Sequence, residues 1–293
     1  MTVILMGILL LVECMLWGLG NPLLKIALES VTPLYCLMIR FFMGSILLLV
    51  IFGKRIIPAL KKPSIKACLI VSVFTGGAFI TANLGIAATT ATNAGFLMSL
   101  AVLFVPFLSV FILKSHVRRI HYLWIAIVVL GLYLVCGNTG TFSFGLGEAM
   151  ALLSSLCYAF VITLSERVLK DADPIALAFC QAAVTGVMCM IGAFIFEGEL
   201  VGSAIQPEAW GVIIYLTIGC TCIAYILQNI ALKYVPAGYA SVIMCSEPIF
   251  TYTASYILLK ETLGVGGMMG GALIIISIVA ASITSDEKKQ IST

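Results

Sequence analysis

Ten apolar stretches, separated by short polar segments, constrain what this chain can fold into. They cover residues 3–27, 33–53, 66–88, 92–113, 120–137, 146–168, 174–196, 209–232, 237–258 and 263–284. Each has close to the roughly 20 residues that a helix needs to cross the hydrocarbon core of a bilayer. Transmembrane β-strands would instead alternate apolar and polar side chains. We therefore expect an all-α integral membrane protein with ten transmembrane helices.

Composition excludes several other classes of protein. Hydrophobic residues make up 62% of the chain and charged residues 10%, whereas soluble domains average about 45–50% and about 25%. A net charge of +3 offers little attraction for nucleic acid, so we expect no such partner. The chain has no CxxC pair and no Walker A loop, so we expect no metal site and no cofactor. The expected partners are a small-molecule substrate and membrane lipid, with the protein a monomer or a homodimer.

The second half of the chain repeats the first. Adding 141 to a residue number relates four positions: Trp17 to Tyr158, Lys25 to Glu166, Pro33 to Pro174 and Arg40 to Gln181. We predict two units of five stretches each, at residues 1–137 and 146–284, followed by a tail at 285–293. Because each unit crosses the bilayer an odd number of times, the two units have opposite orientations. Inverted repeats of this kind are common in alternating-access transporters, which bind substrate at the repeat interface near the midplane.

Basic residues orient the expected bundle. Of the sixteen basic residues, all but Lys25, Arg40 and Lys260 fall in one set of loops or in the tail. Positively charged loops stay in the cytoplasm. We therefore expect a multi-pass protein of the cell (cytoplasmic) membrane with both termini in the cytoplasm.

An ordered set of short motifs resembles the ten-helix EamA-type members of the drug/metabolite transporter superfamily. The motifs are Trp17-Gly18 with Lys25, Arg40-Phe41, Ala231-Leu232-Lys233, Glu247-Pro248 and Lys260-Glu261-Thr262-Leu263. The first half departs from the pattern, with Val105-Pro106 where the second half has Glu247-Pro248. Any function of that acidic residue is therefore asymmetric between the halves. The resemblance implies a carrier of small metabolites or drugs, often an exporter, that does not hydrolyse ATP.

Two carboxylates lie deep in apolar stretches. Glu13 and Glu247 are each about ten residues into a stretch, or about 15 Å along a helix. A charged group at that depth must face a cavity, form a pair or take up a proton, and it is a functional candidate by default. We predict that Glu13 and Glu247 bind the coupling proton or cation. The alternatives are a hydrogen-bonded packing residue at Glu13 and an anchor for Arg40 at Glu247.

A polar and aromatic face follows Glu13 along its stretch. Trp17, Asn21 and Lys25 come at successive intervals of four residues, so they line one side of a helix that Pro22 is expected to kink. We predict that Trp17 and Asn21 contact substrate. Trp17 could equally pack in the core, and for Lys25 we favour a position at the membrane surface.

Arg40 and two polar stripes complete the expected site. Arg40 keeps its charge and needs an anionic neighbour, which could be Glu13, Glu247 or a substrate carboxylate. The stripes have matching spacing in the third and eighth stretches: Ser72, Thr75, Phe79 and Asn83, and Thr217, Thr221, Tyr225 and Gln228. We predict that Arg40, Asn83, Tyr225 and Gln228 bind substrate in a central cavity. The alternative is a set of interhelical hydrogen bonds, worth about 0.6 kcal/mol each.

These features together predict a secondary active transporter, acting as an exporter of amino-acid-like or amphipathic metabolites, with Glu13 offering a route to proton coupling. An organic-cation or multidrug transporter of the same fold is the first alternative, because an acid beside Trp17 attracts cations. A membrane-embedded enzyme is the second. Both histidines and all three aspartates lie outside the apolar cores, so we expect the chain not to be an enzyme.

Overall fold

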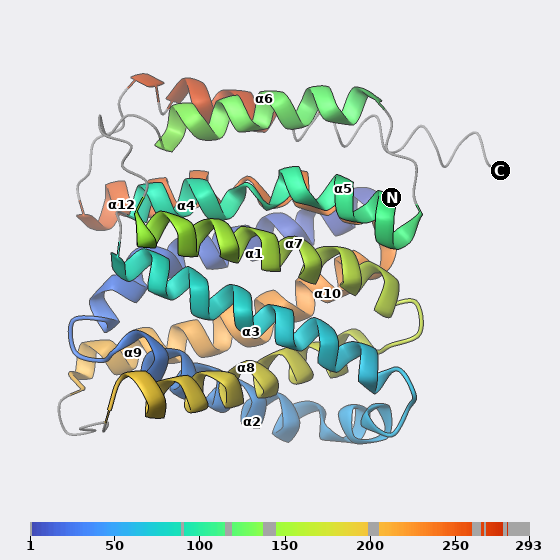
Figure 1. Ribbon diagram of the computed structural model, residues 1–293, viewed down its shortest axis with the longest axis vertical. Helices are drawn as coiled ribbons and strands as arrows, with labels where there is room; N and C mark the ends of the chain where they lie inside the picture. Colours follow the sequence, from blue (N-terminus) through green and yellow to red (C-terminus); the bar gives the residue numbers. More distant parts are fainter. Residues whose placement is uncertain are drawn as a thin grey trace.

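The computed structural model describes residues 2–88, 91–114, 119–136, 145–198, 205–259, 265–266, 268–277 and 280. Within these ranges the chain forms helices and the turns that join them, without a strand. The expectation of an all-α protein is therefore confirmed for the described part. The helices lie side by side along one common direction (Figure 1).

The helices follow the apolar stretches closely. They are α1 (Thr2–Ala27), α2 (Pro33–Leu60), α3 (Ile65–Ala88), α4 (Ala91–Ser99), α5 (Ala101–Leu113), α6 (Arg119–Cys136), α7 (Leu146–Val168), α8 (Pro174–Phe196), α9 (Pro207–Tyr215), the π-helix η3 (Leu216–Ile223), α10 (Ala224–Tyr234), α11 (Ala237–Met244) and α12 (Glu247–Leu259). Residues 268–277 are also helical. Prolines begin α2, α8 and α9, where the missing N–H has no intrahelical partner to lose.

Three stretches differ from simple straight helices. The stretch 92–113 is divided into α4 and α5, and the stretch 237–258 into α11 and α12, with the second break just before Glu247. The stretch 209–232 keeps one direction but contains η3 between α9 and α10. Helix α2 continues through Lys54 to Leu60, beyond the expected end at residue 53. Charged residues end an apolar stretch without ending a helix, because the backbone hydrogen bonds continue where side chains reach water.

Six of the described helices are long and apolar enough to cross a membrane: Val3–Ala27, Pro33–Leu60, Ile65–Ala88, Leu146–Val168, Pro174–Phe196 and Pro207–Tyr234. Large apolar side chains face outward, among them Val50 at 77% exposure and Phe196 at 80%. Several charged and amide side chains are instead buried, including Glu13, Arg40 and Gln228. An apolar exterior around a polar interior is what a hydrocarbon solvent requires. The chain is thus a multi-pass membrane protein.

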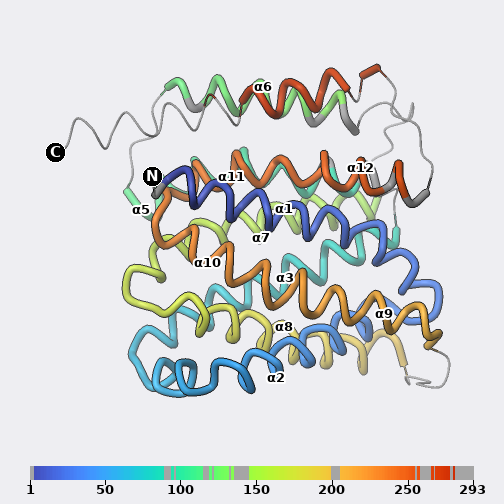
Figure 2. The backbone as a smooth tube through the Cα atoms, turned by 180° about the vertical axis from the view of Figure 1, so that it is seen from behind, coloured from blue at the N-terminus to red at the C-terminus, as the bar shows by residue number. Residues whose placement is uncertain are grey.

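Helices from the two halves of the chain interleave. Helix α3 packs against α7 and α8, while α1 packs against α12, α10 and α9. In Figures 1 and 2, α2 and α8 lie together at one edge of the bundle, and α6 lies beside the helix 268–277 at the other. The interior between these edges is therefore built from both halves.

Helices α2 and α8 are antiparallel and are joined at both ends. The Glu197 carboxylate, at the end of α8, accepts hydrogen bonds from the backbone N–H groups of Leu34 (2.9 Å) and Tyr35 (3.1 Å), which are free donors of the first turn of α2. At the other end, Asp173 caps α8 by accepting from Ile175 N at 2.9 Å, and it also pairs with Arg55 Nε at 2.7 Å. The second half therefore completes the first turn of α2, and an ion pair links the two halves at the other end.

Two glycines allow close approach between the halves. A Cβ at Gly18 would lie 2.5 Å from Phe250 Cβ, so α1 and α12 touch almost backbone to backbone. A Cβ at Gly85 would lie 3.1 Å from the Ala151 backbone nitrogen, on the contact between α3 and α7. Small residues permit such contacts, which drive helix association in lipid.

We expect Gly18→Ala to destabilise the folded protein by about 1–3 kcal/mol, the usual cost of overpacking. The matched control is Gly211→Ala on α9, where an added Cβ meets nothing within 4 Å and alanine has the higher helix propensity. Thermal unfolding of both variants in detergent checks this. Equal melting temperatures would contradict the close α1–α12 contact.

We expect Asp173→Asn to be nearly neutral and Asp173→Ala to cost about 1 kcal/mol, because asparagine keeps the helix cap and alanine removes it. The lost ion pair matters little, since Arg55 is 58% exposed and exposed pairs contribute about 0–1 kcal/mol. Thermal unfolding of both variants in detergent checks this. If asparagine were as destabilising as alanine, the ion pair and not the cap would dominate.

Candidate functional site

Buried polar side chains from α1, α2, α3 and α10 lie in the interior of the bundle. Glu13 and Gln228 are fully buried, Arg40 is 4% exposed and Asn83 is 3% exposed. Lys25, by contrast, is exposed at the end of α1, as its expected surface position requires. Asn21 and Glu247 are partly buried, and the other predicted site residues are buried inside the bundle.

Glu13 is the least satisfied of these groups. Neither of its carboxylate oxygens has a hydrogen-bond partner among the described residues. Its side chain is close enough to interact electrostatically with Glu247, Tyr158 and Tyr225. An ionised carboxylate without a partner in such a place is costly. Glu13 is therefore suited to hold a proton or to receive a donor from a bound molecule.

Glu247 has a partner, and it is not Arg40. Its Oε1 atom accepts a hydrogen bond from Asn21 Nδ2 at 2.8 Å, and the same Asn21 nitrogen donates to Thr251 Oγ1 at 3.3 Å. Two predicted site residues, Asn21 and Glu247, thus join α1 to the start of α12. Because α12 begins at Glu247, the break from α11 places this carboxylate beside α1.

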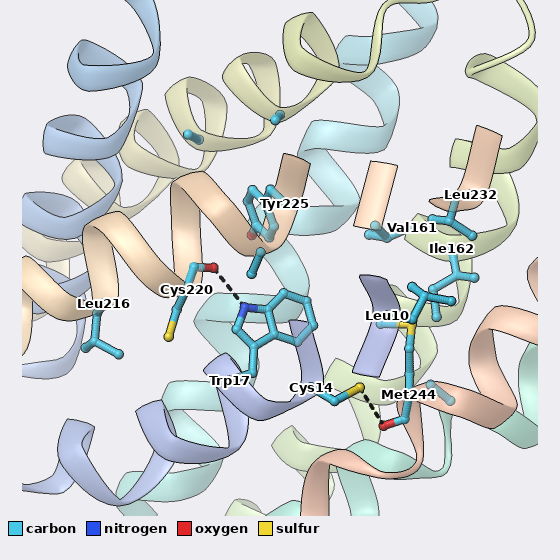
Figure 3. Packing of buried hydrophobic residues seen from close by; sticks show 14 of the residues in the cluster. Leu10, Cys14, Trp17, Val161, Ile162, Leu216, Cys220, Tyr225, Leu232 and Met244 are labelled. Atoms are coloured by element: carbon cyan, nitrogen blue, oxygen red, sulfur yellow. Dashed lines mark hydrogen bonds between the residues drawn. The ribbon is translucent and has the colours of Figure 1, made fainter. Parts of the chain in front are cut away.

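Trp17 lies at the centre of an aromatic cluster. Its Nε1 atom donates to the Cys220 carbonyl at 2.8 Å, a contact visible beside Tyr225 in Figure 3. The Trp17 ring centroid is 5.8 Å from that of Tyr158, 6.1 Å from Tyr225 and 6.2 Å from Phe79, all in edge-to-face geometry. Four helices, α1, α3, α7 and α10, each contribute one of these rings.

Arg40 is held from the adjacent side of the cluster. Its Nε atom donates to Thr221 Oγ1 at 2.7 Å, and its Cζ atom lies 5.0 Å from the Phe41 ring centroid and 5.4 Å from that of Phe79. Among the described residues Arg40 has no ion pair. Of the two anchoring alternatives, Glu247 bonds Asn21 and Glu13 bonds no described group, so neither carboxylate neutralises this guanidinium directly.

The three remaining predicted residues each leave a buried polar atom unsatisfied by any described group. Asn83 donates to Phe79 O at 3.0 Å, but its Oδ1 atom has no partner. Gln228 donates to the Tyr158 hydroxyl, but its Oε1 atom has none, and the Tyr225 hydroxyl is also free. Spare acceptors near aromatic rings could bind the donors of a polar ligand.

Several contact residues were not among the predicted site residues. Tyr158 is related to Trp17 by the repeat offset of 141, so the internal repeat could have identified Tyr158 as a site residue. Thr221 stood in a polar stripe without an assigned partner. The Cys220 carbonyl is a backbone group, and its exposure to Trp17 depends on η3, for which the sequence has no marker. In the described part, no group of three or more potential metal ligands clusters.

Comparison with known proteins places this chain in a family. The sequence profile of the EamA-like transporter family matches residues 4–137 and again residues 145–283. A solved crystal structure superposes with a TM-score of 0.79 over 97% of each chain at 17% identity, so the two share a fold.

Curated relatives agree with the profile. An uncharacterized transporter of Archaeoglobus fulgidus is 24% identical over 92% of this chain and 83% of its own length. The uncharacterized transporter YoaV of Bacillus subtilis is 22% identical over 94% of this chain and 96% of its own length. These names describe transporters, not enzymes. The chain belongs to the EamA-like transporter family, as its motifs predicted, and is a membrane transporter of the drug/metabolite superfamily.

Proposed function

We propose that this protein is a secondary active exporter of amino-acid-like or amphipathic metabolites, working by alternating access across the cytoplasmic membrane. The observation that carries the proposal is the presence, around one aromatic cluster, of two buried charged side chains: the Glu13 carboxylate, which no described residue hydrogen-bonds, and the Arg40 guanidinium, which no described residue ion-pairs. A structural core gains nothing from such costly groups, whereas a carrier can satisfy them with its cargo.

Ten spans in two inverted five-helix units, 1–137 and 146–284, form the framework of the proposal. The contacts support it by their reciprocity: α3 of the first unit packs on α7, the first helix of the second, and α1 packs on α9 and α10, which take the place of α3 in the second unit. Trp17 and Tyr158 are related by the repeat offset, and their ring centroids are 5.8 Å apart. Such closeness is expected of two equivalent residues that lie next to a twofold axis. Both termini are then cytoplasmic, and the tail 285–293 with them.

The proposed cycle assigns a task to each group. Glu13, with Glu247 nearby, takes up the coupling proton or cation, and its charge state biases which side of the bundle is open. Trp17 and Tyr225 supply aromatic walls, and Asn21, Asn83 and Gln228 supply hydrogen bonds. Arg40 provides the positive charge that a zwitterion or an acid requires. The protein works as a monomer or a homodimer in contact with lipid.

An organic cation is the competing cargo. Glu13 lies one helical turn from Trp17, and a cation gains from both the carboxylate and the ring faces. Arg40 opposes this assignment, because a buried positive charge repels cationic ligands. We favour the zwitterion for this reason.

We expect the two equivalent positions Glu29 and Lys170, which precede α2 and α8 and are both exposed, to lie on opposite sides of the membrane. A membrane-impermeant maleimide should label Glu29→Cys in intact cells and Lys170→Cys only after permeabilisation, over the background of the native cysteines. Labelling of both from one side would contradict the inverted arrangement.

We expect Glu13→Gln to abolish pH-gradient-driven transport, because an amide cannot exchange a proton. Flux of labelled phenylalanine and lysine into proteoliposomes, with and without a pH gradient, measures this. The control is Glu208→Gln, an exposed carboxylate in the first turn of α9. Gradient-driven flux that persists in Glu13→Gln would exclude the coupling role.

A further inference from the structure

Two hydrogen bonds repeat each other across the halves of the molecule. Arg40 Nε in α2 donates to Thr221 Oγ1 in η3 at 2.7 Å, and Gln181 Nε2 in α8 donates to Thr75 Oγ1 in α3 at 3.2 Å. Arg40 and Gln181 are separated by the repeat offset of 141, and Thr75 and Thr221 are the second members of the two matching polar stripes. Since α2 and α8 are antiparallel, these contacts lie toward opposite ends of the helix pair.

The two contacts differ in what they leave unsatisfied. Gln181 is neutral, and its Oε1 atom accepts from Asn229 Nδ2 at 2.8 Å, so both ends of its amide are occupied. Arg40 always carries its charge, is 4% exposed and has no acidic partner among the described residues. A buried charge without a counter-charge is strongly unfavourable. The Arg40 contact is therefore the incomplete member of the pair.

The segment η3 controls how Arg40 is presented. Thr217 Oγ1 donates to the Arg40 backbone carbonyl at 3.3 Å, while Thr221 engages the side chain at Nε. A Cβ at Gly44 would lie 2.9 Å from Thr221 Cγ2, so the threonine methyl packs directly on α2. Nε is occupied, and no described residue bonds the two terminal nitrogens, so these can bind a carboxylate by two parallel hydrogen bonds. π-Helical segments are frequent at functional sites for geometric reasons of this kind.

We propose that Thr221 is a positioning residue that orients Arg40, and that Arg40 is the one group that binds a carboxylate of the substrate. The Gln181–Thr75 contact is the equivalent contact in the other half, but it is uncharged and leaves no polar atom of the Gln181 amide free. This inference rests on the proposed carrier function and narrows its substrate to molecules with one carboxylate next to an apolar or aromatic body. The carboxylate binds toward the Arg40 end of the α2–α8 pair, so the cargo has a fixed orientation.

Thr221 and Thr75 allow a matched test. Thr221→Val keeps the methyl group against Gly44 and removes the hydroxyl, and Thr221→Ser does the reverse. Thr75→Val removes the equivalent hydroxyl beside neutral Gln181. Binding is measured on purified full-length protein in which Trp124 and Trp210 are changed to Phe, so that Trp17 fluorescence reports on the cluster. The probes are phenylalanine, 3-phenylpropionate, phenylalaninamide and phenethylamine.

We expect the two carboxylates to bind and Thr221→Val to weaken their binding about ten-fold or more, as loss of one charge-assisted hydrogen bond implies. Thr221→Ser and Thr75→Val should stay within about three-fold of the parent. If Thr221→Val does not yield monodisperse protein, Thr221→Ala compared with Thr221→Ser isolates the hydroxyl in the same way.

Three results would overturn the inference: amide and amine probes that bind as well as the carboxylates, no binding by either carboxylate, or equal losses in Thr221→Val and Thr75→Val. Each of these leaves the carrier proposal intact if proteoliposomes still show gradient-driven flux of any compound. Absence of all flux together with carboxylate binding would instead reject the transport function and keep the anion site.

Discussion

A guanidinium cannot lose its proton, and this bundle holds one inside an apolar exterior. The surroundings of Arg40 follow from that constraint: a hydroxyl from η3 on Nε and the faces of Phe41 and Phe79 against the cation. Cation–π contacts offset part of the cost of burial, but no acidic group among the described residues completes the pair. Among the described residues, the interior therefore surrounds the Arg40 cation with a hydroxyl and two aromatic faces but offers it no counter-charge.

The same interior depends on how the halves interlock. Glu197 from α8 satisfies the first turn of α2, Gly18 brings α1 onto α12, and Asn21 reaches Glu247 across that contact. These contacts place Trp17, on the same turn of α1, against Cys220 and Tyr225. Movement of one half relative to the other would change several site contacts together. In the proposed carrier, a central site at this interface would couple substrate binding to the arrangement of the halves.

Much of this architecture can be predicted from the chain alone. Long apolar stretches specify helices because lipid offers no other partner for backbone groups, and each described helix falls within or close to a predicted stretch. Glu13, Trp17 and Arg40 were recognisable because polar and charged groups are rare at membrane depth. The hydrogen-bond partners of the site residues were harder to predict from the sequence. Asn21 with Glu247 and Arg40 with Thr221 depend on which faces of distant helices meet, and periodicity within a helix carries no information on that.

The sequence by itself determined the membrane class, the positions of the helices, the family and the residues that lipid cannot tolerate, since these follow from local composition and spacing. Only the tertiary structure decided that, within the described part, Glu13 has no hydrogen-bond partner and Arg40 no acidic neighbour, and that η3 presents Thr221 and the Cys220 carbonyl. The physical reason is that hydrogen bonds and ion pairs act over a few ångströms. The packing of helices far apart in the chain sets those distances.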